Sequence, residues 1–514
     1  MNKLLNRLLC AAGSLAVLTG TAAIPAAAED DDKNTFTDNV LTYEKITGGV
    51  EIKQAAAGVT ELIIPEVIDS YPILGIADDA FSGCTSLQKL EIDAKLQYIG
   101  SGAFNGCTKL EEIILPDTVT EIRDGAFCQC QALTEITLPD SVTELGGYAF
   151  SYCTNLEKVK LSDSIKTLPG YVFYYDLELT EVELPEKLHT LSSMSFVGCC
   201  SLKDLALPAS LEDFQPLALL SCMAMQNITV AKDNTTLKTD DDGVLTTADG
   251  KMLLYYPSAL EAESYAVDPS VLQIAPYAFC GADRLKSVSI PDSIAAVGEG
   301  AFSGCIMLSD IHFPASISKI PASLFTDCTS LTSFTVPETV EAIGNSAFMG
   351  CSGLQSVTIP ATVKSVGTMA FFGCTDLHEV TVPETVEEIG DYAFGFQSNP
   401  DENTQTPAVQ EDFTLNCMAN SAAKEYASRS GIHYQQSGID RNIIISALVI
   451  LLAAAAVAAG ALIIHKKKQA EEKKASEPEE KQPEPEVVND PNYTSILAED
   501  DSNEAEKSEQ DHAE

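Results

Sequence analysis

Residues 127–149 read FCQCQALTEITLPDSVTELGGYA, and this 23-residue unit recurs along the chain. Cys130 follows the leading Phe127 by three residues, and Ile136 and Leu138 follow it by nine and eleven. The Phe recurs every 23 residues in two series, Phe81, Phe104, Phe127, Phe150, Phe173 and Phe196, then Phe279, Phe302, Phe325, Phe348, Phe371 and Phe394. A fixed period of this length indicates a repeat protein whose units bury their apolar sides against one another.

Each unit contains a short strand that a proline ends. Ile136 and Leu138 flank the polar Thr137, so the apolar pair faces the core and the polar residue faces solvent. Pro139 cannot donate a backbone hydrogen bond and therefore ends the strand. The spacing Leu133-x-x-Ile136-x-Leu138 is typical of leucine-rich repeats. The predicted fold class is a leucine-rich-repeat solenoid, α+β but mostly β, with 23-residue coils and stacked parallel strands.

The charge of the chain excludes several kinds of partner. The net charge is −44, and residues 29–441 hold 22 Lys and Arg against 59 Asp and Glu, which gives −37. Binding to nucleic acids and other polyanions depends on Lys and Arg that neutralise phosphate or sulfate. We therefore expect no nucleic-acid partner.

Two apolar segments predict secretion and membrane anchoring. Residues 1–28 carry Lys3 and Arg7, then an apolar run and a small-residue end, which is typical of a secretory signal peptide. Residues 443–464 contain no charge and are long enough to span a bilayer as a helix. Lysines at 466–468 favour a cytoplasmic C-terminus. The predicted localisation is the cell membrane, with one transmembrane helix and the solenoid outside.

The remaining segments are assigned by composition and register. The stretch 420–430 has an Asn/Ser start and a Gly stop, which predict a helix that caps the solenoid. The stretch from Gly243 to Tyr256 reads as a β-hairpin with an Asp-Gly turn, inside an insertion. The predicted organisation is a signal peptide at 1–28, an acidic segment at 29–39, an N-terminal cap at 40–75, the solenoid at 76–434 with an insertion at about 231–268 and a capping helix at about 420–430, a stalk at 435–442, the transmembrane helix at 443–464 and a disordered acidic tail at 465–514.

Cysteines occupy one position of the repeat. Stacked coils place equivalent atoms about 4.8 Å apart, which does not by itself exclude disulfides. Parallel side chains give poor disulfide geometry, however, so we favour a column of buried thiols that act as small apolar groups. This structural column comprises Cys84, Cys107, Cys130, Cys153, Cys199, Cys222, Cys305, Cys328, Cys351 and Cys374.

Candidate binding residues are those in which the coils differ. Outward strand positions are mostly Thr, Ser, Glu and Lys, whereas binding hot spots favour Tyr, Trp and Arg. Five tyrosines gather beside the Phe positions of two adjacent coils, and both packing between coils and a ligand-binding patch explain them. These residues are Tyr148, Tyr152, Tyr171, Tyr174 and Tyr175.

Catalytic and metal-binding motifs are not found. The histidines lie in different coils without a nucleophile or acid in a recurring pattern, and no paired C-x-x-C motifs have zinc spacing. No phosphate-binding glycine motif and no G-x-S-x-G motif is present. We expect no enzymatic activity, no catalytic or metal residues and no cofactor.

The repeat resembles the BspA-like family of bacterial leucine-rich-repeat surface proteins. The resemblance rests on the Ala-Phe-x-x-Cys-x-x-Leu unit beginning at Ala347, on the Asp-Gly-Val-Leu hairpin at 242–245, and on the closing segment that begins at Ser421. It covers about 40–434 and implies a solenoid used for attachment at the cell surface, in some members to host matrix proteins or other bacteria. The family motif fixes no ligand-binding residues.

Together these features favour a non-catalytic cell-surface binding or adhesion protein. Its solenoid would present an extended face to an extracellular protein or glycan, and the transmembrane helix would hold it at the membrane. The alternative is a membrane receptor or scaffold that couples ectodomain binding to the acidic cytoplasmic tail. Deletion of residues 469–514 distinguishes the two, because adhesion would survive it and signalling would not.

Overall fold

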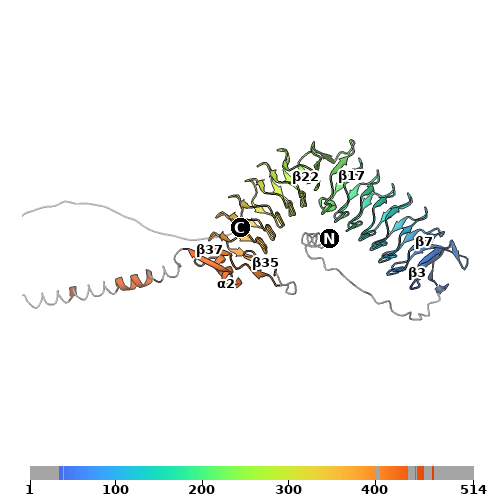
Figure 1. Ribbon diagram of the computed structural model, residues 1–514, viewed down its shortest axis with the longest axis horizontal. Coiled ribbons are helices and arrows are strands. Elements are labelled where there is room, and N and C mark those ends of the chain that lie inside the picture. Colours follow the sequence, from blue (N-terminus) through green and yellow to red (C-terminus); the bar gives the residue numbers. More distant parts are fainter. Residues whose placement is uncertain are drawn as a thin grey trace, which may run out of the picture. The chain divides into compact units, whose positions relative to one another are not determined.

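A computed structural model describes residues 34–38, 40–399, 406–437, 446, 448–456 and 466–467. The predicted signal peptide and most of the predicted tail lie outside these residues. Contacts divide the chain after Arg441, and the two parts are described separately. Figure 1 shows the coils of the first part in a curved row, from strands β3 (Gly49–Ala55) and β7 (Lys89–Ile92) to β37 (Thr414–Met418).

Each regular coil contributes two short strands, one to each of two rows. The coil that begins at Phe127 contains β11 (Glu135–Thr137) and β12 (Glu144–Leu145). β11 pairs in parallel with the next coil's β13 (Lys158–Lys160), and Glu135 stands opposite Lys158, 23 residues later. The first row confirms the predicted parallel strands. The second row was not predicted.

The first row is formed by strands in the Leu-x-x-Ile-x-Leu part of the repeat. Its members are β4 (Glu61–Ile64), β7, β9 (Glu112–Ile113), β11, β13, β15 (Glu181–Glu183), β17 (Asp204–Leu207), β19 (Asn227–Val230), β23 (Ser264–Ala266), β25 (Ser287–Ser289), β27 (Asp310–His312), β29 (Ser333–Thr335), β31 (Ser356–Thr358), β33 (Glu379–Thr381), β37 and β38 (His433–Ser437).

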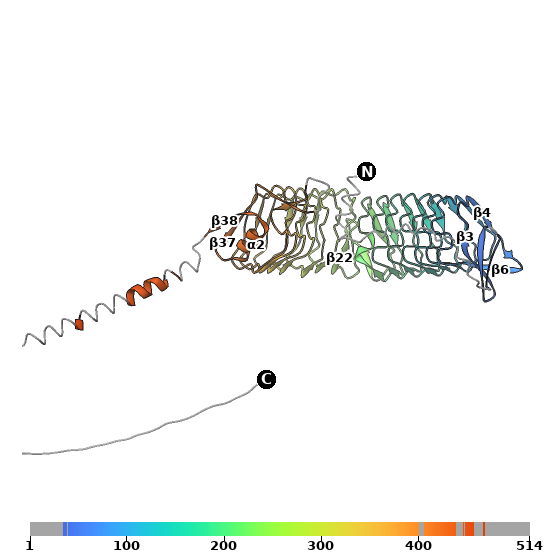
Figure 2. The same cartoon turned by 90° about the horizontal axis from the view of Figure 1, so that it is seen from below.

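The second row is formed by strands that precede the glycine turn. Its members are β6 (Tyr71–Ile76), β8 (Tyr98–Ile99), β10 (Glu121–Ile122), β12, β14 (Thr167–Leu168), β16 (Thr190–Leu191), β18 (Asp213–Phe214), β22 (Met252–Tyr255), β24 (Gln273–Ile274), β26 (Ala296–Val297), β28 (Lys319–Ile320), β30 (Ala342–Ile343), β32 (Ser365–Val366) and β34 (Glu388–Ile389). Figure 2 shows these coils side by side, with β22 near the middle of the stack.

A column of phenylalanine rings runs through the core. The Phe127 ring stacks on Phe104 at 5.2 Å and on Phe150 at 5.5 Å between centroids, and all three are fully buried. Ile136 and Leu138 are buried beside the column. Inward and outward strand positions are therefore as predicted. Repetition of this packing in every coil supplies most of the apolar burial that stabilises the fold.

The N-terminal residues pair with the first coils. Strand β3 forms an antiparallel sheet with β2 and continues in parallel into β6, which begins the second row. The first row begins at β4, which pairs in parallel with β7. The remaining strands at this end are β1 (Thr35–Thr37), β2 (Leu41–Ile46) and β5 (Val67–Ile68).

The structure divides the predicted insertion differently. Tyr256 takes the place of the Phe, and its ring stacks on Phe279 at 5.1 Å between centroids. It begins a regular coil whose strand β23 pairs with β25 at an offset of 23 residues. Leu219 and Tyr256 are 37 residues apart, which is one period of 23 plus 14, so only 14 extra residues are inserted. They form part of the predicted hairpin, in which β21 (Leu245–Thr247) pairs with the second-row strand β22 and with β20 (Leu237–Thr239).

A 3-10 helix replaces the usual turn just before this insertion. The helix, η1 (Pro216–Leu219), places Leu219 at the Phe position, where the side chain is buried. The main core is continuous through Leu219 and Tyr256. The structure therefore has one uninterrupted solenoid here, as the sequence favoured.

Helix α2 (Ala422–Ser430) covers the C-terminal end of the ring column. The Ser421 hydroxyl accepts the Lys424 N–H, and Gly431 ends the helix with a φ of 71°. The Tyr426 hydroxyl donates to the Phe394 carbonyl and accepts the Phe394 N–H, both at 2.9 Å. These contacts confirm the predicted capping helix.

The first row continues beyond Phe394, the last Phe of the 23-residue series. Strand β37 pairs in parallel with β33, and β38 pairs in parallel with β37. The predicted stalk at 435–442 therefore begins inside a strand. A small hairpin of β35 (Phe396–Gln397) and β36 (Ala408–Val409) displaces the coil from the regular period.

In the second part of the chain, residues 448–456 are helical. None of the helices in the described residues has the length and apolar character that a membrane span needs. Of the 22 residues of the predicted transmembrane segment at 443–464, 12 lie outside the described residues.

Candidate ligand-binding surface

The repeat has two backbone positions in the left-handed region, two residues before and two residues after the Phe. Glycine fills the first at Gly102 and Gly125, with φ of 60° and 62°, and the second at Gly106, with φ of 75°. Glycine suits these positions because it has no Cβ, whereas other residues lose about 1–2 kcal/mol there. Other coils nevertheless place larger residues there, including Met194, Tyr277 and Met369 at the first position and Gln129 at the second.

Tyrosine occupies both left-handed positions in two neighbouring coils. Tyr148 and Tyr152 have φ of 57° and 60°, and Tyr171 and Tyr175 have φ of 62° and 60°. Four strained tyrosines together oppose folding by several kcal/mol. The same backbone conformation recurs at non-glycine residues in other turns, so the pair of tyrosines, and not the strain itself, distinguishes these two coils.

The five predicted tyrosines form one cluster of rings. Tyr148 stacks on Tyr171 at 4.6 Å between centroids, and Tyr152 stacks on Tyr175 at 5.7 Å. Tyr174 joins the two stacks through edge contacts with Tyr171, Tyr152 and Tyr175 at 5.5, 5.4 and 4.5 Å. The structure thus brings all five together, and we call them the tyrosine cluster. Such ring contacts contribute about 0.5–1.5 kcal/mol each and offset part of the strain.

The cluster is partly exposed and carries no charge. Tyr148 is 41% exposed and Tyr152 is 36% exposed. Burial is the main cause that raises the pKa of Tyr152 and of Tyr175 to about 12, so both hydroxyls stay protonated at neutral pH. An exposed aromatic surface with hydroxyl groups suits a partner that offers apolar or planar groups.

The cluster is anchored on its C-terminal side. Tyr174 and Tyr175 pack against a small apolar group made of Val197, Leu220 and Cys280. This group is separate from the main core, and it holds the rings against the turns of the following coils. The rings of Tyr148 and Tyr152 are the exposed end of the cluster.

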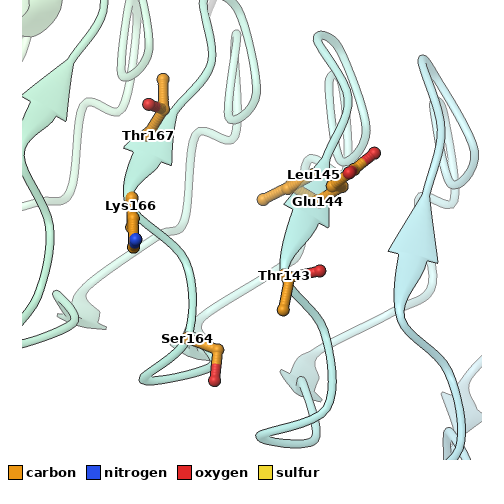
Figure 3. A pocket seen from close by; sticks show the side chains of 6 residues that line it. All are labelled: Thr143, Glu144, Leu145, Ser164, Lys166 and Thr167. Carbon is orange, nitrogen blue, oxygen red and sulfur yellow. The ribbon is translucent and has the colours of Figure 1, made fainter.

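A shallow groove crosses the second row beside the cluster. Figure 3 shows its lining in two adjacent coils, with Leu145 and Glu144 on β12 and Thr167 on β14. The other lining residues are Thr143, Ser164 and Lys166. A second depression shares Glu144 and Leu145 and is also lined by Ser101, Glu121, Ile122, Arg123, Asp124 and Gly146.

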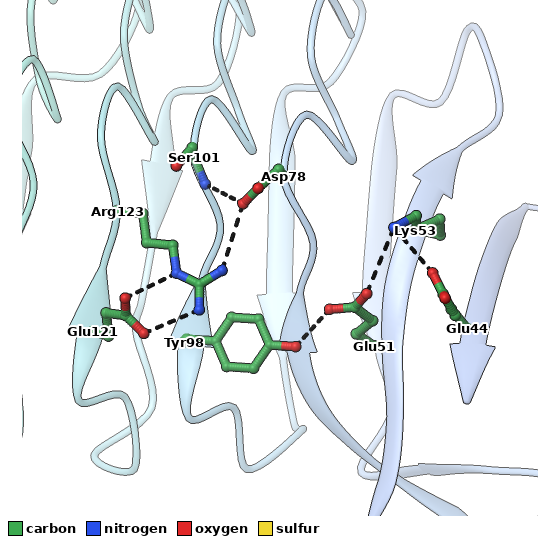
Figure 4. Close-up of polar contacts among 8 residues, drawn as sticks. All are labelled: Glu44, Glu51, Lys53, Asp78, Tyr98, Ser101, Glu121 and Arg123. Atoms are coloured by element: carbon green, nitrogen blue, oxygen red, sulfur yellow. Dashed lines mark hydrogen bonds and ion pairs between the residues drawn. The ribbon is translucent and has the colours of Figure 1, made fainter. Parts of the chain in front are cut away.

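An ion-pair network borders this second depression. Arg123 contacts Glu121 at 2.9 Å and Asp78 at 3.6 Å, and its guanidinium lies 4.7 Å from the centre of the Tyr98 ring. The Tyr98 hydroxyl donates to Glu51 at 2.5 Å. Figure 4 shows how the network continues through Glu51 to Lys53 and Glu44. Arg123 is therefore fully engaged within the chain.

The first row offers a polar surface with few anchors. Its outward residues are exposed, and Lys158 contacts Glu181 at 3.2 Å between coils. Exposed ion pairs of this kind contribute little to stability or affinity. The tyrosine cluster therefore remains the stronger candidate surface.

The column cysteines form hydrogen bonds between successive coils. From Cys107 onward, the Sγ of each column cysteine donates to the carbonyl of the Phe in the preceding coil, as Cys130 does to Phe104 at 3.3 Å. Burial raises the pKa of these thiols, to about 12 for Cys107, so they keep the proton that they donate. All cysteines that the structure describes are free thiols. Cys84, in the first coil, is only half-buried.

Sequence reasoning missed the grooves of the second row and the strained turns. The turns could have been found by aligning Tyr148 and Tyr171 with Gly102 and Gly125, since glycine at one repeat position signals a left-handed backbone.

A cluster of three His, Cys, Asp or Glu side chains able to hold a metal is not found within the described residues.

Comparison with known proteins identifies the repeat. The model of the BspA type leucine-rich-repeat region matches residues 74–176, 120–240 and 266–401. A leucine-rich cell surface protein of Faecalibacterium prausnitzii is 27% identical, with a TM-score of 0.53, and the match covers 71% of this chain and 95% of that one.

Two further solved structures match the chain. A leucine-rich-repeat protein of Bacteroides ovatus is 24% identical, with a TM-score of 0.44, and covers 78% of this chain and 100% of its own. The pneumococcal vaccine antigen PcpA is 21% identical, with a TM-score of 0.48, and covers 79% of this chain and 99% of its own. No curated protein matches the chain. Because the family model spans more than half of its residues, this chain belongs to the BspA-type leucine-rich-repeat family.

Proposed function

We propose that this chain is a non-catalytic cell-surface binding or adhesion protein, whose solenoid presents an extended surface to an extracellular protein or glycan. Membership of the BspA-type family supports this role, as does the similarity to a protein described as a cell surface protein. The proposal includes secretion through residues 1–28 and anchoring through residues 443–464, for which the apolar runs of the sequence are the support.

The tyrosine cluster is the observation that carries the proposal. Other coils also place a non-glycine residue at a left-handed position, such as Met194 or Tyr277, but within the described residues only these two coils carry tyrosine at both positions. Tyr148 and Tyr152 are also exposed over more than a third of their surface. Large rings held rigidly and partly exposed are the side chains that most often dominate binding energies. We therefore place the binding surface at the cluster.

The experiment is a binding survey with the full-length chain in a mild non-ionic detergent. Immobilised extracellular matrix proteins, glycans and whole bacterial surfaces are probed with it, with heat-denatured chain as the control. We expect saturable binding to at least one class of surface. Equal signals from the native and the denatured chain on every surface would remove the basis of the proposal.

A further inference from the structure

Tyr171 stacks on one face of the Tyr148 ring, with the two ring planes 7° apart, and Tyr148 is 41% exposed. Among the described residues no second ring stacks on the other face, which looks toward the N-terminal coils and which we call the open face. The equivalent position in the preceding coil is Gly125, where an added Cβ would meet only the Cβ of Cys128, at 3.8 Å. By contrast, the Tyr277 ring lies directly over Gly300, 2.3 Å from where a Cβ would be. A planar group can therefore reach the Tyr148 ring from the Gly125 side.

The Asp124 carboxylate is held next to Tyr148 in the chain. The exposed Asp124 side chain accepts the Gly147 N–H at 2.7 Å, which fixes its carboxylate one residue from Tyr148. Glu144 and Glu121 line the adjoining depression, whose Arg123 is already paired with Glu121 and Asp78. The local charge is therefore negative, as is that of the whole segment 29–441. A partner surface that fits here carries positive charge.

Tyrosine rings elsewhere on this chain hold cations. Arg123 lies over Tyr98 at 4.7 Å, Lys45 over Tyr71 at 5.1 Å, and Arg429 over Tyr426 at 5.5 Å from the ring centres. Within the part of the chain that the structure describes, the tyrosine cluster receives no such cation from Lys or Arg. Its rings are thus available to a cation from another molecule.

We infer that the Tyr148 face binds an arginine side chain of a basic protein partner. The planar guanidinium stacks on the ring above Gly125, and its charge lies toward the carboxylate of Asp124. Arginine fits better than lysine because a planar, weakly hydrated ion stacks on an aromatic face and pairs with a carboxylate at the same time. This inference rests on the proposed function and names the chemistry of the partner.

Binding of a short oligoarginine peptide to the full-length chain in detergent tests the inference. An oligolysine peptide of equal length carries the same charge and serves as the comparison. Tyr148→Gly introduces the residue that Gly125 and Gly102 show to be compatible with this backbone, so the turn is retained. Tyr392→Gly is the matched control, because Tyr392 occupies the same repeat position, with φ of 57° and 37% exposure.

We expect oligoarginine to bind more tightly than oligolysine, and Tyr148→Gly to weaken oligoarginine binding by on the order of tenfold. Asp124→Asn is expected to weaken it as well and to reduce its dependence on salt, whereas Tyr392→Gly leaves it unchanged. Equal affinity for both peptides, or equal loss in Tyr148→Gly and Tyr392→Gly, overturns the inference, since either result means diffuse attraction to an acidic surface.

The inference and the proposed function fail in different ways. In one outcome, Tyr148→Gly abolishes binding to an extracellular surface found in the survey, but oligoarginine does not compete with that binding. The tyrosine cluster then remains the binding surface, and the arginine assignment is wrong. If oligoarginine binds at Tyr148 but no extracellular surface is recognised, the cation site stands and the adhesive role is wrong.

Discussion

Replacing Asp176 by cysteine should stabilise the middle of the solenoid. Asp176 stands three residues after Phe173, where ten other coils carry a cysteine. Its side chain is fully buried, Oδ1 accepts the Cys153 N–H at 2.8 Å, and Oδ2 has no hydrogen-bond partner. A buried acceptor without a partner destabilises the folded chain by about 1–3 kcal/mol.

The magnitude follows from the neighbouring coils. A cysteine at this position can donate its S–H to the Phe150 carbonyl, as the thiol of Cys153 does to Phe127 at 3.1 Å. This restored bond contributes about 1 kcal/mol. The Cys153 N–H keeps its bond to the Phe150 carbonyl at 3.2 Å, so removal of the carboxylate leaves no donor unpaired. We expect Asp176→Cys to raise the free energy of unfolding by about 2–4 kcal/mol at neutral pH.

The gain should depend on pH. Burial raises the pKa of Asp176 well above its ordinary range, so the folded chain retains this proton to a higher pH than the unfolded chain. The stabilisation from the protonated form is complete below the unfolded pKa of about 4 and is lost as pH rises toward the folded pKa. Asp176→Asn cannot ionise, so its advantage over the natural chain should grow by up to about 1.4 kcal/mol per pH unit in that window.

Amide hydrogen exchange across the full-length chain is the suitable assay, because repeat proteins unfold locally and the chain has no Trp to report unfolding. Exchange of residues 150–199 should slow in both variants, whereas exchange of the distant coils 325–374 should not change. An unchanged or faster exchange at 150–199, or a gain that is equal at about pH 5 and pH 8, would refute the reasoning.

Three further predictions concern the column, the cap and the anchor. Cys328→Ala removes the S–H bond to the Phe302 carbonyl and leaves a small cavity, so denaturant unfolding should show that the free energy of unfolding falls by about 2 kcal/mol. An unchanged free energy of unfolding would show that the thiol bond does not stabilise the column. Tyr426→Phe leaves the N–H and the carbonyl of Phe394 without their partner, so it should destabilise the C-terminal coil by about 2 kcal/mol. Amide hydrogen exchange of that coil should become faster, and unchanged exchange would contradict the capping role. Deletion of 443–464 should release the chain from the membrane fraction into the medium, and retention in the membrane would contradict the proposed anchor.

Most of the first row and the core could be predicted from the sequence. Phe127, Ile136 and Leu138 keep both their spacing and their chemistry from coil to coil, so the period and the inward face can be read directly. The second row could not, because strands such as Glu144–Leu145 are two residues long and alternate too briefly to show a period.

The bounds of the insertion and the start of the stalk were misjudged for a related reason. Tyr256 packs as the Phe does in other coils but carries a hydroxyl. The spacing of Phe residues alone therefore does not reveal the coil that begins at Tyr256. Strand β37 is displaced by the hairpin of β35 and β36, which breaks the 23-residue spacing while the parallel pairing continues. Strand pairing depends on the register of the two backbones in space. An insertion changes the number of residues between two paired strands, so the 23-residue spacing no longer identifies the pair.

The candidate site was predicted only as a group of tyrosines. Their sequence positions placed Tyr148 and Tyr171 in adjacent coils, and the structure adds the stacking and the positive φ. The open face above Gly125 depends on the direction in which each ring leans, and the position of the Asp124 carboxylate depends on its hydrogen bond with the Gly147 N–H. The pattern of residue types in the sequence reports neither.

We propose that the tyrosine cluster, and not the polar first row, binds the partner. The most direct measurement compares dissociation constants for a surface identified in the binding survey. The variants are Tyr148→Gly combined with Tyr152→Gly at the cluster, Lys158→Ser at the first row, and Tyr392→Gly as the matched turn. We predict that the tyrosine pair weakens binding by tenfold or more, about 1.4 kcal/mol, and that the other two leave it within about twofold. A large loss with Lys158→Ser and none with the tyrosine pair would contradict the account.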